Sequence, residues 1–203
     1  MMDGKENRPW LGSYDPWVAP EMAVPEETYV DLLERAMHQY ADAAAYHFLG
    51  TTCTYRELDE RSLRFAAYLA HMGCKPGDVV GINLPNTPQY LIALAGIMRS
   101  GCVANGVSPL MTAKEMAYQI NDAGVKVLVT LDAILEQRVH KIRDQVPALQ
   151  GCVVTNIADY LPSYKRYAGK WLKKIPSGKV APIPGKEIIT FRALMRQYAP
   201  HRP

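Results

Sequence analysis

Hydrophobic residues recur along this chain in short runs that alternate with longer amphipathic stretches. Apolar runs at 79–83, 103–107, 125–130 and 152–155 predict buried strands, and the stretches between them show the three-to-four-residue period of helices, the last from Asp132 to about Gln145. Strands that are apolar on both faces and alternate with helices are typical of a parallel sheet with right-handed crossovers. The pattern predicts an α/β fold, a mostly parallel sheet covered by helices on both faces.

The expected helix boundaries carry capping residues. Thr54 with Glu57, and Thr112 with Glu115, form Thr-x-x-Glu capping boxes, in which the threonine accepts a backbone hydrogen bond and the glutamate reaches back. A threonine followed by proline at 87–88 predicts another N-cap with a first-turn proline. The corresponding stop signals are glycines, which adopt the left-handed conformation easily: Gly73, Gly101 and Gly124.

The two ends of the chain differ from this alternating region. Residues 8–25 are rich in proline, which predicts an extended arm held in place by its aromatic residues, Trp10, Tyr14 and Trp17. A helix is expected from Thr28, and two short strands, 45–49 and 51–55, flank Gly50. We therefore divide the chain into an extended arm (1–27), an α/β subdomain (28–158) and a basic segment rich in proline and tyrosine (159–203).

Charge is distributed unevenly between these parts. Residues 151–203 contain ten lysines and arginines and two acids, whereas the whole chain has a formal net charge of only +3. If residues 160–174 are helical, aromatic side chains share one face and basic side chains the others, an arrangement suited to an anionic membrane surface. A helix that packs its aromatics on the subdomain explains the pattern equally well. The candidate membrane-surface residues are Tyr164, Lys165, Arg166, Tyr167, Lys170, Trp171, Lys173 and Lys174.

The types and spacing of the reactive and charged residues do not indicate a particular reaction. Ser177-Gly178-Lys179 resembles the end of a phosphate loop but lacks its first glycine and its final Ser or Thr. The four cysteines lie far apart and are expected to be buried, the five histidines are scattered, and the pairs Glu26-Glu27 and Asp59-Glu60 are interpreted as solvated helix faces or first-turn residues. We predict no catalytic, cofactor-binding or metal-ligating residue.

The chain also lacks the usual targeting patterns. The longest apolar run, Tyr90–Met98, is far shorter than the roughly 20 residues of a spanning helix. The first residues are charged and precede no apolar segment, so a secretory signal is not expected. We expect a cytoplasmic protein, with peripheral contact at a membrane as a further expectation.

One family resemblance covers nearly the whole chain. The run Leu58–Thr130, above all GDVVGINLPNTPQYLIALAGIMRSG (77–101) and SPLMTAKEMAYQINDAGVKVLVT (108–130), resembles the adenylate-forming (AMP-binding) superfamily. TYREL at 54–58 looks like its early TY-x-EL element. The arm RPWLGSYDPWVAPE and the tail from 154 onward are most similar to long-chain fatty acid CoA ligases, although ANGV at 104–107 departs from the more apolar strand end of the family.

The resemblance implies an ATP-dependent acid–thiol ligase that converts a fatty acid and ATP into an acyl-adenylate, and then into a thioester of coenzyme A. In the family the phosphate loop, the magnesium-binding acid, the ribose-binding aspartate and the C-terminal lysine all come later than Pro203. We therefore expect an N-terminal part truncated before the phosphate loop and inactive alone, with ATP, Mg and coenzyme A bound only by the full-length enzyme.

The expected partners are the remainder of the enzyme, a long-chain fatty acid, an anionic membrane surface and a second copy in a homodimer; nucleic acid is not expected. Two alternatives stay open. One is part of an aryl- or medium-chain acyl-CoA ligase. The other is a non-catalytic α/β module that binds anionic membranes.

Overall fold

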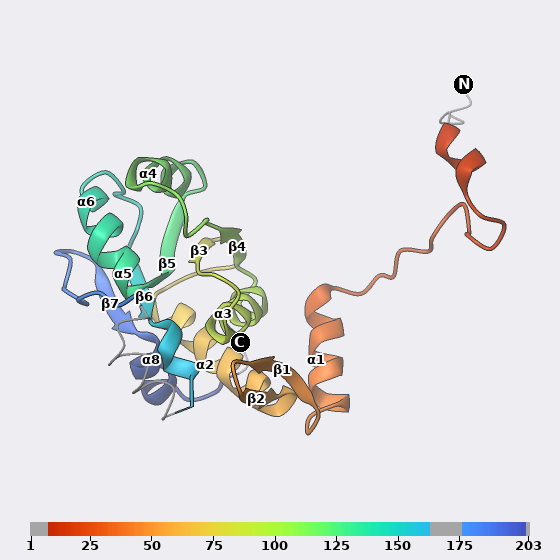
Figure 1. Ribbon diagram of the computed structural model, residues 1–203, viewed down its shortest axis with the longest axis horizontal. Helices are drawn as coiled ribbons and strands as arrows, with labels where there is room; N and C mark the ends of the chain where they lie inside the picture. Colours follow the sequence, from red (N-terminus) through yellow and green to blue (C-terminus); the bar gives the residue numbers. More distant parts are fainter. Residues whose placement is uncertain (1–7, 163–175, 202–203) are drawn as a thin grey trace.

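A five-stranded parallel sheet organises the protein (Figure 1). The structure, a computed structural model, describes residues 8–162 and 176–201. The sheet order is β4-β3-β5-β6-β7, and every neighbouring pair is parallel. The strands are β3 (Val79–Asn83), β4 (Val103–Gly106), β5 (Val125–Leu131), β6 (Gly151–Thr155) and β7 (Glu187–Thr190).

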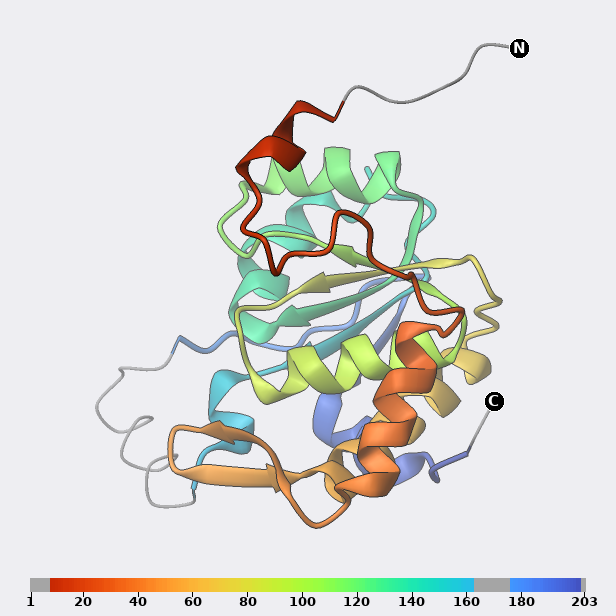
Figure 2. The same ribbon diagram turned by 90° about the vertical axis from the view of Figure 1, so that its right-hand side faces the viewer.

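Helices cover both faces of this sheet, so the predicted α/β class is confirmed (Figure 2). One apolar core lies under α2 (Tyr55–His71), α3 (Pro88–Arg99) and α8 (Phe191–Gln197), with α1 (Tyr29–Gln39) packed on α2 and α3. The other core lies under α4 (Ala113–Asp122), α5 (Asp132–Ile134), the π-helical turn η2 (Leu135–Val139) and α6 (His140–Ile142). No helix among these described residues is long and apolar enough to cross a membrane.

Most of the predicted helix boundaries are confirmed. The Thr54–Glu57 and Thr112–Glu115 capping boxes are both formed, and α2 and α4 begin directly after their threonines. Helix α3 begins at Pro88 as expected, but the side chain of Thr87 makes no capping hydrogen bond. The single helix expected from Asp132 to about Gln145 is instead interrupted by the π-helical turn and ends at Ile142.

Strand β7 and helix α8 are absent from the sequence prediction. Both lie within the segment 159–203, which shows no clear strand–helix alternation. In the structure β7 pairs with β6, and Phe191 and Leu194 of α8 are buried in the first core. This part of the chain therefore adds the strand β7 to the sheet and the helix α8 to the first core.

The arm projects away from the body of the molecule (Figure 1). It contains a short 3-10 turn, η1 (Pro9–Ser13), and then extended chain up to α1. The aromatic residues expected to hold it in place are exposed, Trp17 with 81% of its surface accessible. The exposure of these aromatics does not fit the prediction that they hold residues 8–25 in place.

Two acid pairs also differ from their interpretation. Asp59 accepts a hydrogen bond from the buried guanidinium of Arg99, so it does not belong to a purely solvated face. Glu27 precedes the N-cap Thr28 and forms an ion pair with Arg35, so it lies outside the first turn of α1. The sequence pattern could not show either partner, because each lies at least a helical turn away.

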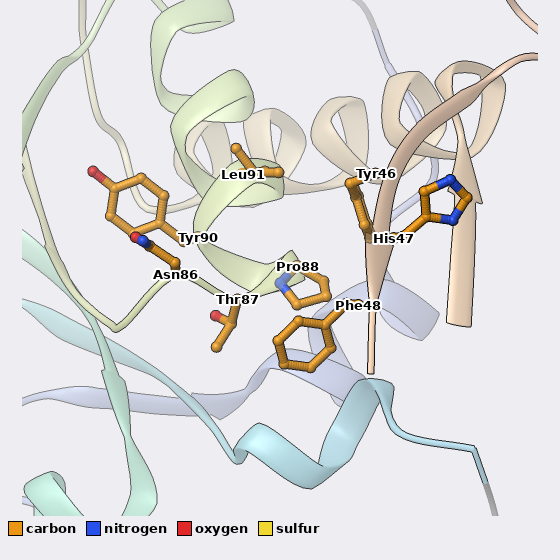
Figure 3. Close-up of a pocket in the computed structure, with 8 residues that line it drawn as sticks. All are labelled: Tyr46, His47, Phe48, Asn86, Thr87, Pro88, Tyr90 and Leu91. Atoms are coloured by element: carbon orange, nitrogen blue, oxygen red, sulfur yellow. The ribbon is translucent and has the colours of Figure 1, made fainter. Parts of the chain in front are cut away.

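A β-hairpin connects α1 to α2. It is formed by the two short strands expected on either side of Gly50, β1 (Ala44–Phe48) and β2 (Thr51–Thr54), which pair antiparallel. Its turn places Leu49 at φ 48° and Gly50 at φ 96°. A left-handed conformation is rare for leucine, because its Cβ approaches the following carbonyl oxygen. The hairpin tip lies beside the first turn of α3, where the strongest candidate for a site is found (Figure 3).

Candidate functional site at the carboxyl edge of the sheet

The winding of the sheet changes direction at its carboxyl edge. The chain leaves β3 toward β4 on one side and later returns to β5 on the other side of β3, so the direction of winding changes between β3 and β5. In open α/β sheets, ligands bind in the crevice outside the carboxyl ends of the strands at such a point. The candidate site therefore lies at this edge, where several polar side chains are buried.

The ends of β3 and β5 are joined by a buried hydrogen-bond network. Asn83 and Thr130 are both fully buried. The Thr130 hydroxyl donates to Asn83 Oδ1 at 2.9 Å, and Asn83 Nδ2 donates to the Val107 carbonyl at 3.0 Å. These bonds connect three segments of the chain at the point where the winding changes direction.

A second network connects α3 to the end of β6. Gln89, in the first turn of α3, donates through Nε2 to the Thr155 hydroxyl at 2.9 Å and to the Asn156 carbonyl at 3.0 Å. Thr155 in turn donates to Asp159, and Asn156 donates to Asp132 at 2.8 Å. The first turn of α3 is thus held in place from the sheet side.

Two polar atoms in this first turn have no partner among the described residues. They are the Thr87 hydroxyl oxygen and Gln89 Oε1, and both are buried. An unpaired buried polar atom costs about 1–3 kcal/mol, so such atoms are rare in interiors and call for an explanation. Other buried polar atoms without a hydrogen-bond partner among the described residues belong to Tyr46, Tyr68, Gln119 and His140.

An apolar pocket opens at the same turn (Figure 3). Its volume is about 210 Å³, and it lies between the β1–β2 hairpin and the start of α3. Phe48 and Pro88 lie next to each other on one side, while Tyr90 and Leu91 extend from α3. No aspartate, glutamate, lysine or arginine lines the pocket. The pocket therefore suits an uncharged, apolar group.

A larger groove, of about 520 Å³, lies between α2 and α8. The Arg61 guanidinium lies 5.5 Å from the centre of the Tyr160 ring and pairs with Glu57, and Arg64 pairs with Glu60. Burial raises the pKa of Tyr160 to about 12, so this phenol stays protonated at neutral pH. Glu57 and Glu60 offset these two arginines, and Arg196, which also lines the groove, adds a third positive charge.

Burial disfavours the thiolate form of two cysteines in the cores. Burial raises the pKa of the Cys102 thiol to about 11 and that of Cys152 to about 12, so neither forms a thiolate at neutral pH. Within 8–162 and 176–201, no group of three His, Cys, Asp or Glu residues could hold a metal ion. Ser177-Gly178-Lys179 precedes no helix, and the backbone N–H of Lys179 donates to the Glu136 carboxylate.

The candidate membrane-surface residues lie outside the described part of the chain, in 163–175, so they stay a prediction. The proposed helix does not begin at Tyr160, however, because this residue ends the 3-10 turn η3 (Ile157–Tyr160) and Leu161 is extended. Tyr160 packs edge-on against Phe191. Asn83, Gln89 and Thr130 were not predicted as site residues from the sequence. The signal for them is a polar residue at the end of an apolar strand or in the first turn of the next helix.

The comparisons with known proteins now identify the family. The family model described as AMP-binding enzyme matches residues 33–190. The chain belongs to the AMP-binding enzyme family. The resemblance inferred from the sequence is thereby confirmed, and the carboxyl edge described above belongs to the matched region.

Curated relatives carry a more specific name. A long-chain-fatty-acid–CoA ligase of Escherichia coli O6:H1 (strain CFT073) is 34% identical over 172 residues, which cover 82% of this chain and 30% of the ligase. The ligase of the same name from Yersinia pestis is 31% identical over 198 residues, which cover 93% of this chain and 34% of the ligase. The chain thus spans about a third of the length of these relatives.

Solved structures support the fold. The chain is similar to the anthranilate CoA ligase AuaEII in complex with anthranoyl-AMP, with a TM-score of 0.69 and 21% identity over 88% of this chain and 30% of that chain. It is also similar to acetoacetyl-CoA synthetase from Streptomyces lividans, with a TM-score of 0.66 and 22% identity over 86% of this chain and 26% of that chain. At these identities, the likeness concerns the α/β architecture alone.

Proposed function

We propose that this chain is the N-terminal part of a long-chain fatty acid CoA ligase. The observation that carries the proposal is its 31–35% identity to curated long-chain-fatty-acid–CoA ligases, over 75–93% of this chain. The family match supports adenylate-forming chemistry for the whole protein.

The proposed reaction has two steps. A fatty acid carboxylate attacks the α-phosphate of ATP, which gives an acyl-adenylate and releases pyrophosphate. The thiol of coenzyme A then attacks the acyl carbon, loses its proton and displaces AMP, so the products are acyl-CoA, AMP and pyrophosphate. Magnesium supplies charge neutralisation for the phosphates.

In this proposal the described residues support catalysis without taking part in it. The Asn83–Thr130 and Gln89–Thr155 hydrogen bonds fix the carboxyl edge, and the apolar pocket beside α3 forms part of the acyl-binding wall. The phosphate-binding loop, the magnesium ligands and the coenzyme A site are assigned to the remainder of the enzyme. On its own, the chain is expected to be inactive.

Membrane contact forms a second part of the proposal. The ten lysines and arginines in residues 151–203 are opposed by only two acids, so this segment is expected to attract an anionic surface. We place the protein in the cytoplasm with peripheral membrane contact, near the fatty acids on which the whole enzyme would act.

Substrate class is tested by acid-dependent exchange of pyrophosphate into ATP, measured on the ligase translated from the complete reading frame. Palmitate, octanoate and benzoate are compared at matched concentrations. The proposal expects the highest kcat/KM with palmitate, because each buried methylene adds binding energy. A preference for benzoate or octanoate would support the aryl- or medium-chain alternative instead.

A further inference from the structure

Two of the four cysteines occupy equivalent positions at the ends of neighbouring helices. A left-handed glycine follows the C-cap of each helix, Gly73 with φ 70° after α2 and Gly101 with φ 66° after α3, and a cysteine comes directly after each glycine. The N–H of each cysteine donates back into the last turns of its helix, at 3.0 Å for Cys74 and 3.1 Å for Cys102. The backbone therefore holds both cysteines in the same type of helix-terminating turn.

These two turns meet at one edge of the sheet. Helix α2 leads into β3 and α3 leads into β4, and the two strands are parallel neighbours, so both helices end beside the amino ends of the strands. The Gly77 N–H donates to the Gly101 carbonyl at 2.9 Å. The Cys102 Sγ lies 3.5 Å from the carbonyl oxygen of Lys75, the residue that directly follows Cys74. The turns are thus in direct contact through their backbones and through one thiol.

The two thiols differ in access to solvent. Cys74 is partly exposed, whereas Cys102 is 7% exposed, and neither forms a disulfide in this structure. Burial, and then charge on Cys74, raise the pKa of the Cys102 thiol to about 11, so the two sulfur atoms lie close enough to interact electrostatically. An accessible thiol beside a buried one fits the two roles in disulfide formation, in which one thiol reacts with the oxidant and the other resolves the product.

We propose that Cys74 and Cys102 form a modification site, at which hydrogen peroxide couples the two thiols in an intramolecular disulfide. The Cys74 sulfur attacks one peroxide oxygen and breaks the O–O bond, which gives a sulfenic acid and water. The Cys102 sulfur then attacks the Cys74 sulfur, loses its proton and displaces the hydroxyl group as water. In total, two thiols are oxidised to one disulfide while one peroxide is reduced to two water molecules.

The disulfide closes a loop that contains part of the candidate site. Residues 74–102 include β3 and α3, and with them Asn83 and Gln89, whose hydrogen bonds connect segments of the carboxyl edge. A cross-link of this kind stabilises a protein mainly by restricting its unfolded chain. The oxidised protein is therefore expected to unfold at a higher urea concentration than the reduced protein.

Peptide mapping tests the pair directly. Trypsin cleaves after Arg99, which separates Cys74 from Cys102, and it leaves Cys53 and Cys152 in two further peptides. The protein translated from the complete reading frame is treated with hydrogen peroxide, its remaining thiols are alkylated, and the unreduced digest is analysed by mass spectrometry. We expect the Cys74 peptide to be joined to the Cys102 peptide within one molecule. Alkylation of both thiols, or links from either to any other cysteine or to a second molecule, would overturn the proposal.

Variants connect the link to its effect on stability. Cys74→Ser should abolish both the cross-link and the rise in urea midpoint that peroxide causes. Cys53→Ser is the matched control, because Cys53 lies in the same core at 2% exposure, and it should keep the link between Cys74 and Cys102. A peroxide-induced rise that persists in Cys74→Ser would reject the link as its cause.

Oxidation in concentrated urea provides a control that requires no variant. In the unfolded chain, links from Cys74 to Cys53 should appear, because Cys53 is nearer to it in sequence than Cys102 is. Only the folded protein should favour the link to Cys102, since the contact between the two turns brings these thiols together. The same mixture of links in urea and in native buffer would contradict a site formed by the fold.

Discussion

At the scale of single residues, Arg99 carries a buried positive charge that needs ion-pair and hydrogen-bond partners in the folded protein. Its side chain is 1% exposed and lies between α1, α2 and α3. It donates to the Asp59 carboxylate and to the Ser62 hydroxyl, and it pairs with Glu34 at 3.3 Å. A buried guanidinium without its partners is costly, so these contacts hold the three helices in one arrangement.

Replacement of Asp59 should therefore destabilise the protein. Loss of one partner from a buried ion pair costs about 3–5 kcal/mol, and we expect Asp59→Ala to cost about 2–3 kcal/mol, because Glu34 remains and Asp59 is partly exposed. Urea denaturation measures this change. Glu60→Ala, which removes a more exposed partner of Arg64, is the matched control and should change stability by less than about 1 kcal/mol. Equal effects of the two variants would contradict this account of Arg99.

Asp78 predicts how stability responds to acid. Hydrogen bonds from the Lys126 ammonium and from the Lys75 backbone N–H lower the pKa of the Asp78 carboxyl in the folded protein. Because the folded-state pKa lies below the unfolded value of about 3.9, the stabilisation is complete above that value and disappears as the pH falls through the folded-state pKa.

The difference in stability between the wild type and Asp78→Asn should therefore be largest near neutral pH and shrink below about pH 4. Thermal melts from neutral to strongly acidic pH measure it. Asp144→Asn, which removes an 87% exposed carboxylate, provides the control and should show a small difference at every pH. A gap for Asp78→Asn that stays constant into strong acid would contradict the assigned hydrogen bonds.

At the scale of elements, α2 and α3 approach each other closely at Gly96. A Cβ at this position would lie 2.8 Å from the Phe65 Cβ and 2.8 Å from the Ser62 carbonyl oxygen. Gly96→Ala should destabilise the protein by about 1–3 kcal/mol through overpacking, although alanine favours helices by about 1 kcal/mol. Gly106→Ala, where a Cβ meets no atom within 4 Å, is the control. Urea midpoints that rise for Gly96→Ala would show that the helices can separate at low cost.

Local signals predicted some elements and could not predict others. The Thr54 and Thr112 capping boxes depend on residues three positions apart, and both boxes are formed as predicted. Strand β7 depends on pairing with β6, more than thirty residues earlier, and its segment has no strand–helix alternation of its own. The π-helical turn in 135–139 has no residue signature that the periodicity could detect.

The candidate site was harder to predict than the fold. Asn83 and Thr130 lie in apolar strands that the pattern placed correctly, but their shared hydrogen bond depends on β3 and β5 being neighbours. The sequence shows only that β4 follows β3 and that β5 follows β4. The position of β5 on the other side of β3 becomes visible only in the assembled sheet. The pocket likewise requires the hairpin and α3, about forty residues apart, to meet.

At the scale of the whole molecule, charge separation predicts membrane contact. The protein should sediment with phosphatidylserine vesicles at low salt and be released at high salt, while phosphatidylcholine vesicles retain little, because basic residues near an anionic surface contribute about 1 kcal/mol each. Replacement of Lys165, Lys170 and Lys173 by glutamine should weaken retention. The matched control replaces Lys5, Lys114 and Lys141, which precede the basic segment. Retention that is independent of salt or vesicle charge would contradict the prediction.

The assignment of chemistry to the remainder of the enzyme is the central claim about the whole molecule. We propose it because the chain spans about a third of the length of its relatives and because the polar residues at the carboxyl edge bond to one another. The proposed acyl-binding wall and the hydrogen-bonded edge would matter only once the phosphate-binding parts are joined to them.

The most direct measurement is palmitoyl-CoA formation from palmitate, ATP, Mg²⁺ and coenzyme A, by this chain alone and by the protein translated from its complete reading frame. The account predicts product only with the complete protein, and a lower yield when Leu91→Trp is introduced there. Palmitoyl-CoA formed by the 203-residue chain alone would contradict the account, because it would place the catalytic groups within residues to which we assign structural and binding roles.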